Sequence, residues 1–309
     1  MAKSLDYVIV TPARNEAAYL ELTIQSMIAQ THLPLRWVIV SDGSTDGTDE
    51  IVQKYLSGHP WIELVRMPER EQRHFAGKAH AFNAGFERVK SLSFDVIGNL
   101  DADVAFAPDH FEFLISKMGE SPRLGVAGAP FREGTFQYDY RFQNIENVWG
   151  GCQLFRRACY EAIGGYMPLK GGGIDHLAVV SARMRGWQTR TFTERVCEHN
   201  RVMGTAEHNG LMARVRQGKK DHAMGNHPLW QLFRVLYQMK FSPYVIGGLA
   251  LGWGYAQPLL SRRKIPLPED LIRFVRREQM LRLRRFITGK RISSRQEPPV
   301  AVAHASPRG

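Results

Sequence analysis

The chain has 309 residues, 44% of them hydrophobic, enough for one domain of roughly 200 to 250 residues plus an appendage. This composition excludes disordered and collagen-like proteins. Lys and Arg number 41 against 30 Asp and Glu, a net charge of +11. The surplus is concentrated between Arg262 and Arg295, which predicts an anionic partner for that end of the chain. Cys152, Cys159 and Cys197 form no C-x-x-C pair, which predicts reduced thiols and argues against a zinc site.

The N-terminus has no charged-then-apolar leader pattern, so we expect a cytoplasmic protein. From Leu5 to about Arg190, β-rich runs alternate with helical patterns. This alternation predicts an α/β fold with a mostly parallel, Rossmann-like sheet flanked by helices. Strands are expected at 7–10, 37–40, 62–65, 94–100 and 124–127, and helices at 16–30, 46–56, 77–89 and 108–118. Ligands of such folds bind at the carboxyl ends of the strands.

The run F-D-V-I-G-N-L-D-A-D-V-A-F at 94–106 ends an apolar strand with Asp101 and Asp103. Residues i and i+2 of a strand point to the same side, so both carboxylates can converge on one small volume. Two hard oxygen ligands suit Mg²⁺ or Mn²⁺, particularly when phosphates complete the coordination shell. The alternative is an Asp-rich turn that only ends the strand.

Two further loops follow predicted strands. In T-P-A-R-N-E at 11–16, Pro12 is expected to end the strand and a helix to begin near Asn15 or Glu16. Free backbone N–H groups there could meet a nucleotide, although an ordinary capped helix start is the alternative. In S-D-G-S-T-D-G-T at 41–48, the spacing resembles half of a calcium loop, but Gln53 stands where the last, bidentate Glu is needed. Asp42 is better suited to bind a base or sugar.

The phosphate-binding loops of other nucleotide folds are absent from the sequence, which has no G-x-x-x-x-G-K-[ST] and no G-x-G-x-x-G after a strand. A nucleotide would therefore be held chiefly by a metal and side chains. This combination indicates a nucleotide-sugar site.

Five ordered motifs between residues 5 and 200 resemble family 2 glycosyltransferases of the GT-A fold. They are T-P-A-R-N-E at 11–16, V-S-D-G-S-T-D-G-T at 40–48, G-K-A-H-A-F-N-A-G at 77–85, N-L-D-A-D at 99–103 and F-R-R-A-C-Y-E-A-I-G-G-Y at 155–166. The resemblance implies an inverting, hexosyltransferase-type enzyme that uses a nucleoside-diphosphate sugar and Mg²⁺ or Mn²⁺.

The resemblance also implies roles for individual residues. Asp42 would face the base, Asp101 the ribose or metal waters, and Asp103 the metal. Lys78 would line the donor pocket, although a solvated helix face is the alternative for this lysine. The remaining residues expected to border the nucleotide are Pro12, Ala13, Asn15 and Glu16.

Inverting transfer needs a general base for the acceptor hydroxyl. The family resemblance implies the Asp of a Glu-Asp pair, and the matching segment here is G-G-G-I-D-H at 171–176, so Asp175 is the expected base. Ile174 replaces the usual Glu. An N-cap Asp is the alternative for Asp175, and His176 is the alternative base.

After residue 195 the family's Q-x-x-R-W motif is missing, and a basic cluster at 214–222 takes its place. A departing diphosphate needs positive charge, which Arg supplies through paired hydrogen bonds. Arg216 is the first candidate, with Arg214 and Lys219 behind it. A solvated basic helix is the alternative reading.

The C-terminal part has an uncharged run at 241–261, in which Pro243 and Pro258 should limit the helix to about 14 residues. We expect it to lie on or partly enter a membrane, with a full span or a core helix as alternatives. A basic amphipathic helix is predicted within 266–290 and suits an anionic membrane surface. We therefore expect a catalytic domain at 1–225, a helical, membrane-interfacial appendage at 226–292 and a disordered tail at 293–309.

The sequence thus predicts a cytoplasmic enzyme, peripheral on the inner face of the plasma membrane. It would transfer sugar from a nucleotide donor, with UDP-sugars favoured, to a saccharide acceptor that is membrane-associated and lipid-linked, in cell-surface polysaccharide synthesis. The alternatives are a donor-binding pseudoenzyme, a nucleotidyltransferase and, because of the charge, a nucleic-acid-binding protein. No nucleic-acid-binding motif is present, and no nucleic acid partner is expected.

Overall fold

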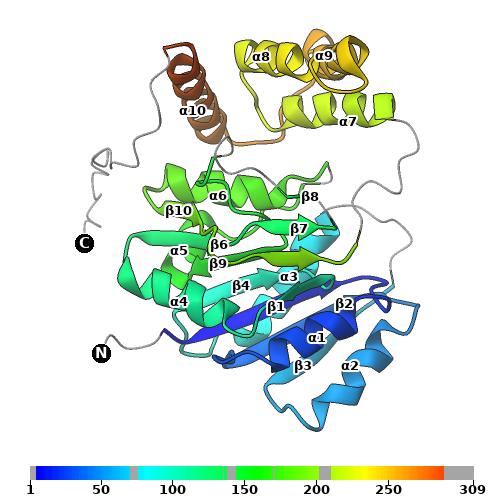
Figure 1. The fold of residues 1–309 in the computed structure, drawn as a ribbon, viewed down its shortest axis with the longest axis vertical. Coiled ribbons are helices and arrows are strands. Elements are labelled where there is room, and N and C mark those ends of the chain that lie inside the picture. The colour runs from blue at the N-terminus through cyan, green and yellow to red at the C-terminus, as the bar shows by residue number, and fades with distance from the viewer. Residues whose placement is uncertain are drawn as a thin grey trace, which may run out of the picture.

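The fold was analysed in a computed structural model that describes residues 5–69, 76–134, 136–137, 144–169, 171–201 and 210–288. A central seven-stranded sheet has the order β10-β6-β9-β4-β1-β2-β3 (Figure 1). Within it, β9 is antiparallel to β4 and β6, and the other pairings are parallel. The strands are β1 (Tyr7–Ala13), β2 (Arg36–Asp42), β3 (Ile62–Met67), β4 (Val96–Leu100), β6 (Leu124–Gly128), β9 (Cys152–Arg156) and β10 (Gln188–Thr191). The predicted mostly parallel α/β fold is confirmed.

The two faces of this sheet are covered by separate helix layers because side chains alternate along each strand. Tyr7 and Ile9 of β1 belong to one buried cluster, and Val8 and Val10 belong to the other. The first cluster includes residues of α1 (Leu20–Ile28), α2 (Thr48–Leu56) and α4 (His110–Glu120). The second includes residues of α3 (Ala76–Val89), α5 (Arg157–Ile163) and α6 (Ile174–Met184).

The first loop differs from the sequence expectation at two points. Pro12 does not end β1, which continues to Ala13, with Pro12 in register with Val40 of β2. A proline near a strand end sacrifices a single N–H donor, which the parallel pairing tolerates there. The helix also begins later, at Leu20, because Asn15 takes a left-handed conformation with φ 55°. The polypeptide therefore forms a loop before α1.

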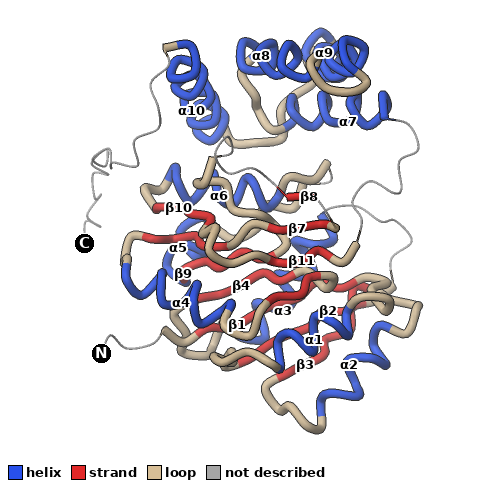
Figure 2. The backbone as a smooth tube through the Cα atoms, viewed as in Figure 1, coloured by secondary structure: helices blue, strands red, loops and turns tan. Residues whose placement is uncertain are grey.

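A smaller four-stranded sheet, with the order β5-β11-β7-β8, lies beside the central sheet (Figure 2). Its strands are β5 (Val104–Phe106), β7 (Phe131–Glu133), β8 (Phe136–Gln137) and β11 (Cys197–His199). Antiparallel pairing of β5 with β11 sets His199 opposite Val104, the residue after Asp103. All three cysteines are buried free thiols, and the Sγ atoms of Cys152 and Cys197 lie 3.7 and 3.6 Å from His110 Nε2. These contacts connect β9, β11 and α4.

The C-terminal part forms a separate helical layer beyond α6, drawn yellow to red in Figure 1. Its helices are α7 (Gly210–Ala223), α8 (Pro228–Gln238), α9 (Tyr244–Leu260) and α10 (Glu269–Ile287). Helix α7, which the predicted domain boundary assigns to the catalytic domain, packs directly on α9. A Cβ atom added at Gly218 would overlap the carbonyl oxygen of Leu251, and one added at Gly254 would overlap that of Val215. These two glycines allow the helix backbones to touch.

Helix α9 is longer than predicted, since it includes Pro258 within its last turn. A proline so near the helix end removes only one backbone hydrogen bond. One side of α9 is buried through Gly247, Gly248 and Gly254, while Leu249, Trp253 and Leu260 are exposed on it. Among the described residues, no helix combines the length and apolarity that a membrane crossing requires.

Helix α10 connects the helical layer to the α/β part of the protein that contains the central sheet. Leu271 and Val275 are buried against Leu177 and Val180 of α6. Arg183 of α6 and Glu278 of α10 form a bidentate ion pair. The two nitrogen to oxygen distances are 2.8 and 2.9 Å. The far end of α10 leaves Phe286 and Ile287 exposed. The predicted disordered tail at 293–309 lies outside the described residues.

We predict that Gly254→Ala will lower the thermal midpoint of unfolding. The added methyl group would force α7 and α9 apart, and such overpacking costs about 1–3 kcal/mol. Gly119→Ala in α4 is the matched control, because no atom lies within 4 Å of the added Cβ there. That control should be neutral or stabilise by up to about 1 kcal/mol through helix propensity. Equal midpoints for the two variants would contradict this account of the α7–α9 contact.

Candidate active site

The candidate active site lies at the carboxyl ends of the parallel strands, where Lys78 connects two carboxylates. Lys78 is near the start of α3, Asp101 follows β4, and Asp175 is in the first turn of α6. Lys78 Nζ is 2.7 Å from Asp101 Oδ1 and 3.3 Å from Asp175 Oδ1. The structure therefore brings together three residues that the sequence analysis selected from motifs far apart in the chain.

The electrostatics of this cluster reflect an excess of negative charge. Burial alone would lower the pKa of Lys78, but the charges of Asp101 and Asp175 outweigh it and raise that pKa above its usual value. The pKa of Asp101 is raised mainly by burial, and the neighbouring Asp175 and Asp103 add to this shift against the opposing effect of Lys78. The cluster thus favours added positive charge.

The backbone of Gly150 supports the lysine. Its carbonyl oxygen accepts hydrogen bonds from Lys78 Nζ at 3.2 Å and from Asn99 Nδ2 at 2.7 Å. Asn99 Nδ2 also lies 3.4 Å from Asp101 Oδ1. A Cβ added at Gly150 would overlap the carboxyl group of Asp175. Only glycine leaves Asp175 room to reach Lys78.

The position of Asp175 is set by the glycines before it. Gly172 and Gly173 have φ values of 79° and 84°, which are accessible to glycine at little cost. Ile174 is buried in the core, so the side chain in the place of the family's usual Glu points away from the site. Gln153 Nε2 lies 3.5 Å from the carbonyl oxygen of Asp175 and anchors this turn.

Asp103 lies in a second charged group beside the first. Its Oδ2 atom is 3.5 Å from His199 Nε2 and 3.4 Å from Arg201 Nε, and Arg201 also pairs with Glu16. Burial would raise the pKa of Asp103, but the hydrogen bond and charge of His199 and the charge of Arg201 lower it overall. Burial would lower the pKa of His199, but Asp103 and Glu133 raise it. The other ring nitrogen, Nδ1, is 3.5 Å from Glu133 Oε2.

Asp103 and His199 are the candidate metal ligands of this second group. Asp103 offers a carboxylate oxygen, which suits Mg²⁺ and Mn²⁺, and His199 offers an imidazole nitrogen. Metal-binding imidazoles usually have the second nitrogen held by a carboxylate, and Glu133 is in that position. Asp101 is paired with Lys78, so Asp103 and His199 would supply two protein ligands and the donor phosphates the others.

The loop at 14–17 is held by the loop at 44–48. The backbone N–H groups of Asn15, Glu16 and Ala17 donate to the side chains of Ser44, Thr48 and Asp46, respectively. The expectation that these N–H groups are free for a nucleotide is therefore wrong. The side chains of the other predicted donor-binding residues remain at the carboxyl ends of the strands: Pro12 and Ala13 in β1, and the buried Asp42 at the end of β2.

The predicted basic cluster lies on α7, where Arg216 and Lys219 are exposed and Arg214 is half-buried. The end of α7 approaches the first turn of α6. A Cβ added at Gly173 would lie 2.6 Å from Met224 Sδ and 3.3 Å from Lys220 Cε. The role of Arg216 towards a diphosphate stays a prediction.

The sequence analysis missed His199, Arg201, Asn99 and Gly150. His199 is the last residue of β11 and Arg201 stands two residues later, the same spacing that singled out Asp101 and Asp103. That spacing was the available signal for a converging pair. Gly150 contributes its backbone carbonyl oxygen. Every residue has such an oxygen, so the residue type gives no signal for this role.

Comparisons with known proteins agree with this geometry. The family description "Glycosyl transferase family 2" matches residues 8–168. A poly-beta-1,6-N-acetyl-D-glucosamine synthase of Staphylococcus aureus is 32% identical over 145 residues, 47% of this chain and 31% of the synthase. An uncharacterized glycosyltransferase of Nostoc is 32% identical over 112 residues, 36% of this chain and 32% of that protein. The chain thus spans about a third of the length of these relatives.

Solved structures share the fold. The mannosyltransferase PcManGT from Pyrobaculum calidifontis, solved with GDP-Man and Mn2+, has a TM-score of 0.58 at 19% identity, covering 94% of this chain and 89% of that one. TarS 1–349 of S. aureus, solved with UDP-GlcNAc, has a TM-score of 0.53 at 13% identity, covering 69% and 66%. With the family match extending over more than half of the sequence, the chain belongs to glycosyltransferase family 2 and has the GT-A fold.

Proposed function

We propose that the protein is an inverting, metal-dependent glycosyltransferase that moves a sugar from a UDP-sugar to a membrane-associated, lipid-linked saccharide. The observation that carries the proposal is the bridge from Asp101 through Lys78 to Asp175. It joins the carboxylate expected near the donor diphosphate to the carboxylate expected to act on the acceptor. Donor and acceptor groups can then meet at one point, as in-line displacement requires.

Asp175 is the proposed general base. Its Oδ1 atom is buried beside Lys78, and the side chain as a whole is partly exposed, so the rest of the carboxylate can accept a hydrogen bond from an acceptor hydroxyl. As the hydroxyl oxygen attacks the anomeric carbon, its proton passes to Asp175 while the bond to the nucleoside diphosphate breaks on the opposite face of the sugar. Lys78 holds the carboxylate in place.

The diphosphate would lie at Asp101, Asp103 and His199, of which Asp103 and His199 are proposed to hold Mg²⁺ or Mn²⁺ with Asp103 as the main ligand. When bound, the metal supplies positive charge to the departing diphosphate. Asp42 and the side chains of the loop at 12–16 are proposed to contact the nucleotide, and Arg216 to approach the phosphates. The names of the S. aureus synthase and of the UDP-GlcNAc complex of TarS support a UDP-sugar, whereas the GDP-Man complex of PcManGT is the competing precedent.

The helical layer is proposed to bind the cytoplasmic face of an anionic membrane. Helices α8 and α9 expose large apolar side chains, including Leu229, Leu232, Leu236, Ile246, Leu249, Trp253 and Leu260. Contiguous apolar patches of this kind mark interaction sites. Between Asp221 and Glu269 the sequence has no acidic residue, while Lys240, Arg262, Arg263 and Lys264 are exposed. Apolar surface with basic residues around it suits anionic lipid.

The same features favour sugar transfer over nucleotidyl transfer and over nucleic-acid binding. A nucleotidyltransferase or a nucleic-acid-binding protein gives no reason for an aspartate such as Asp175 beside Lys78. The basic residues also surround an apolar surface, which nucleic acid does not need. A protein that binds the donor without catalysing transfer would differ in one respect: it would bind the donor but show no turnover.

We predict that Asp103→Asn abolishes metal-dependent donor binding. A thermal-shift panel of UDP-, GDP-, dTDP- and CMP-linked sugars with Mn²⁺ should stabilise the wild type, by about 2.7 kcal/mol at a ligand concentration of 100 times Kd. Glu120→Gln, an exposed carboxylate on α4, should behave like the wild type. Failure of every nucleotide to shift the wild type in any metal would refute the proposed donor class.

We predict that Asp175→Asn lowers turnover by about 10² to 10⁴-fold, because the general base is lost. Turnover is measured as release of the nucleoside diphosphate with a membrane lipid extract as acceptor source. Donor-induced stabilisation should persist, since Asp175 contacts the acceptor side. His176→Asn is the matched control and tests the alternative base next to it. Activity that survives Asp175→Asn and is lost in His176→Asn would transfer the role to His176.

We predict that Gly150→Ala reduces kcat by about 10²-fold, because the added methyl group displaces Asp175 from Lys78. The Mn²⁺-dependent donor shift should change little. Gly171→Ala is the control, since its added Cβ has no neighbour within 4 Å. Wild-type kcat in Gly150→Ala would show that the position of Asp175 is not critical.

A further inference from the structure

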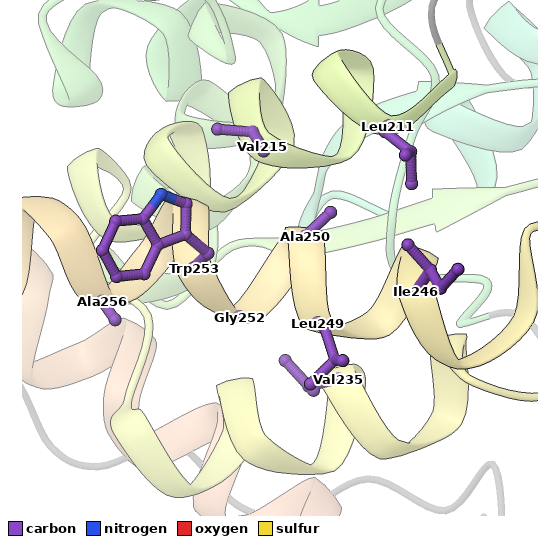
Figure 3. A pocket seen from close by; sticks show the side chains of 9 residues that line it. All are labelled: Leu211, Val215, Val235, Ile246, Leu249, Ala250, Gly252, Trp253 and Ala256. Atoms are coloured by element: carbon purple, nitrogen blue, oxygen red, sulfur yellow. The ribbon is translucent and has the colours of Figure 1, made fainter.

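An apolar groove lies between α7, α8 and α9 (Figure 3). It has a volume of about 650 Å³, within the range of small-molecule sites. The nine residues that line it are all apolar, with Leu211 and Val215 on α7, Val235 on α8, and Leu249 and Trp253 on α9 among them. The groove therefore offers side-chain contacts to hydrocarbon and to no polar ligand.

The groove exists because the distance between the three helices varies along their length. At Gly254 and Gly218 the backbones of α7 and α9 touch, and at Gly248 an added Cβ would overlap Met239. At Gly252 the nearest atoms to an added Cβ are methyl groups of Val235, at 3.4 and 3.7 Å. The helices are thus held together around a space that their own side chains leave open.

The rim of the groove is exposed to solvent. Ile246, Leu249 and Trp253 keep 60%, 58% and 59% of their surface accessible. Each Å² of apolar surface left in water costs on the order of 25 cal/mol relative to burial, so an occupant that covers the rim is favoured. The exposed cations Arg262–Lys264, which follow the end of α9, fit an occupant with an anionic head group.

Helix α7 leads from the groove to the proposed base. Val215 lines the groove, and Lys220 of the same helix approaches Gly173, two residues before Asp175. Five residues of helix advance about 7.5 Å. A lipid held by its chain in the groove could therefore present its head group close to the acceptor side of the active site.

We propose that this groove binds the hydrocarbon chain of the phosphate-headed lipid that carries the acceptor. The inference rests on the proposed function, because it assumes an acceptor carried by the membrane. Binding of the chain fixes the lipid on the enzyme, and the saccharide then extends towards Asp175.

The test is photolabelling with a diazirine-bearing hexadecyl phosphate in vesicles of phosphatidylcholine and phosphatidylglycerol, with labelled residues identified by mass spectrometry. We expect label on groove residues such as Val235 and Trp253. Gly252→Leu should fill the groove without changing charge, and should lower groove labelling by about tenfold or more while vesicle binding persists. Ala256→Leu fills another part of the lining and serves as a second variant if Gly252→Leu unfolds. Leu260→Ala, on the same exposed face outside the groove, should leave groove labelling unchanged.

Equal labelling of the wild type and the filled variants would overturn the inference, as would label spread evenly over the exposed residues of α8 and α9. A lipid-free dimer that Gly252→Leu dissociates would assign the groove to a second copy of the chain instead. Donor-induced stabilisation with Mn²⁺ separates this result from the proposed function. An unlabelled groove in a protein that still binds donor refutes the groove alone, whereas loss of donor binding in the wild type refutes the transferase proposal.

Discussion

The ammonium group of Lys78 is the interaction on which the active site depends. It lies between two carboxylates, one directly after β4 and one in α6, elements that are far apart in the sequence. Without a cation there, Asp101 and Asp175 would repel each other across a partly buried space. The lysine is carried by α3, whose Gly85 allows close packing on the sheet, since an added Cβ there would overlap Val10. The position of Lys78 is therefore fixed by the close packing of α3 on the central sheet.

The helical layer follows a different constraint, which is the close approach of α7 and α9. Gly218 and Gly254 lie where the backbones of the two helices meet. The helices therefore pack more closely than residues with larger side chains would allow. The layer is then anchored to the body through α10, by Leu271 and Val275 and by the Arg183–Glu278 pair. In the described part of the chain, α8 and α9 lie on the far side of α7 from the central sheet, and α7 lies between them and α6 (Figure 1).

Much of the fold was predictable from the sequence, because β-branched runs and helical periodicity alternate in the first two thirds of the chain. Asp101, Lys78 and Asp175 were also found in advance, since each stands in a recognisable motif. Local backbone geometry was not predictable. The left-handed Asn15 and the late start of α1 depend on hydrogen bonds to a loop near residue 46, and β1 runs through Pro12 because β2 pairs with it. The i, i+2 spacing marks His199 and Arg201 as a pair, but their place beside Asp103 comes from the pairing of β11 with β5, which the local sequence does not reveal.

The pairing of β5 with β11 has a consequence for the order in which the protein matures. Arg201 and Glu16 are 185 residues apart in sequence, and His199 meets Asp103 only after this short strand has been made. During synthesis from the N-terminus, the strands that carry Asp42 and Asp101 emerge and can pair well before then. A nascent chain can therefore build the part of the sheet that carries the proposed nucleotide contacts while the proposed metal ligands are still incomplete. Competence for catalysis arises late, after most of the polypeptide has left the ribosome.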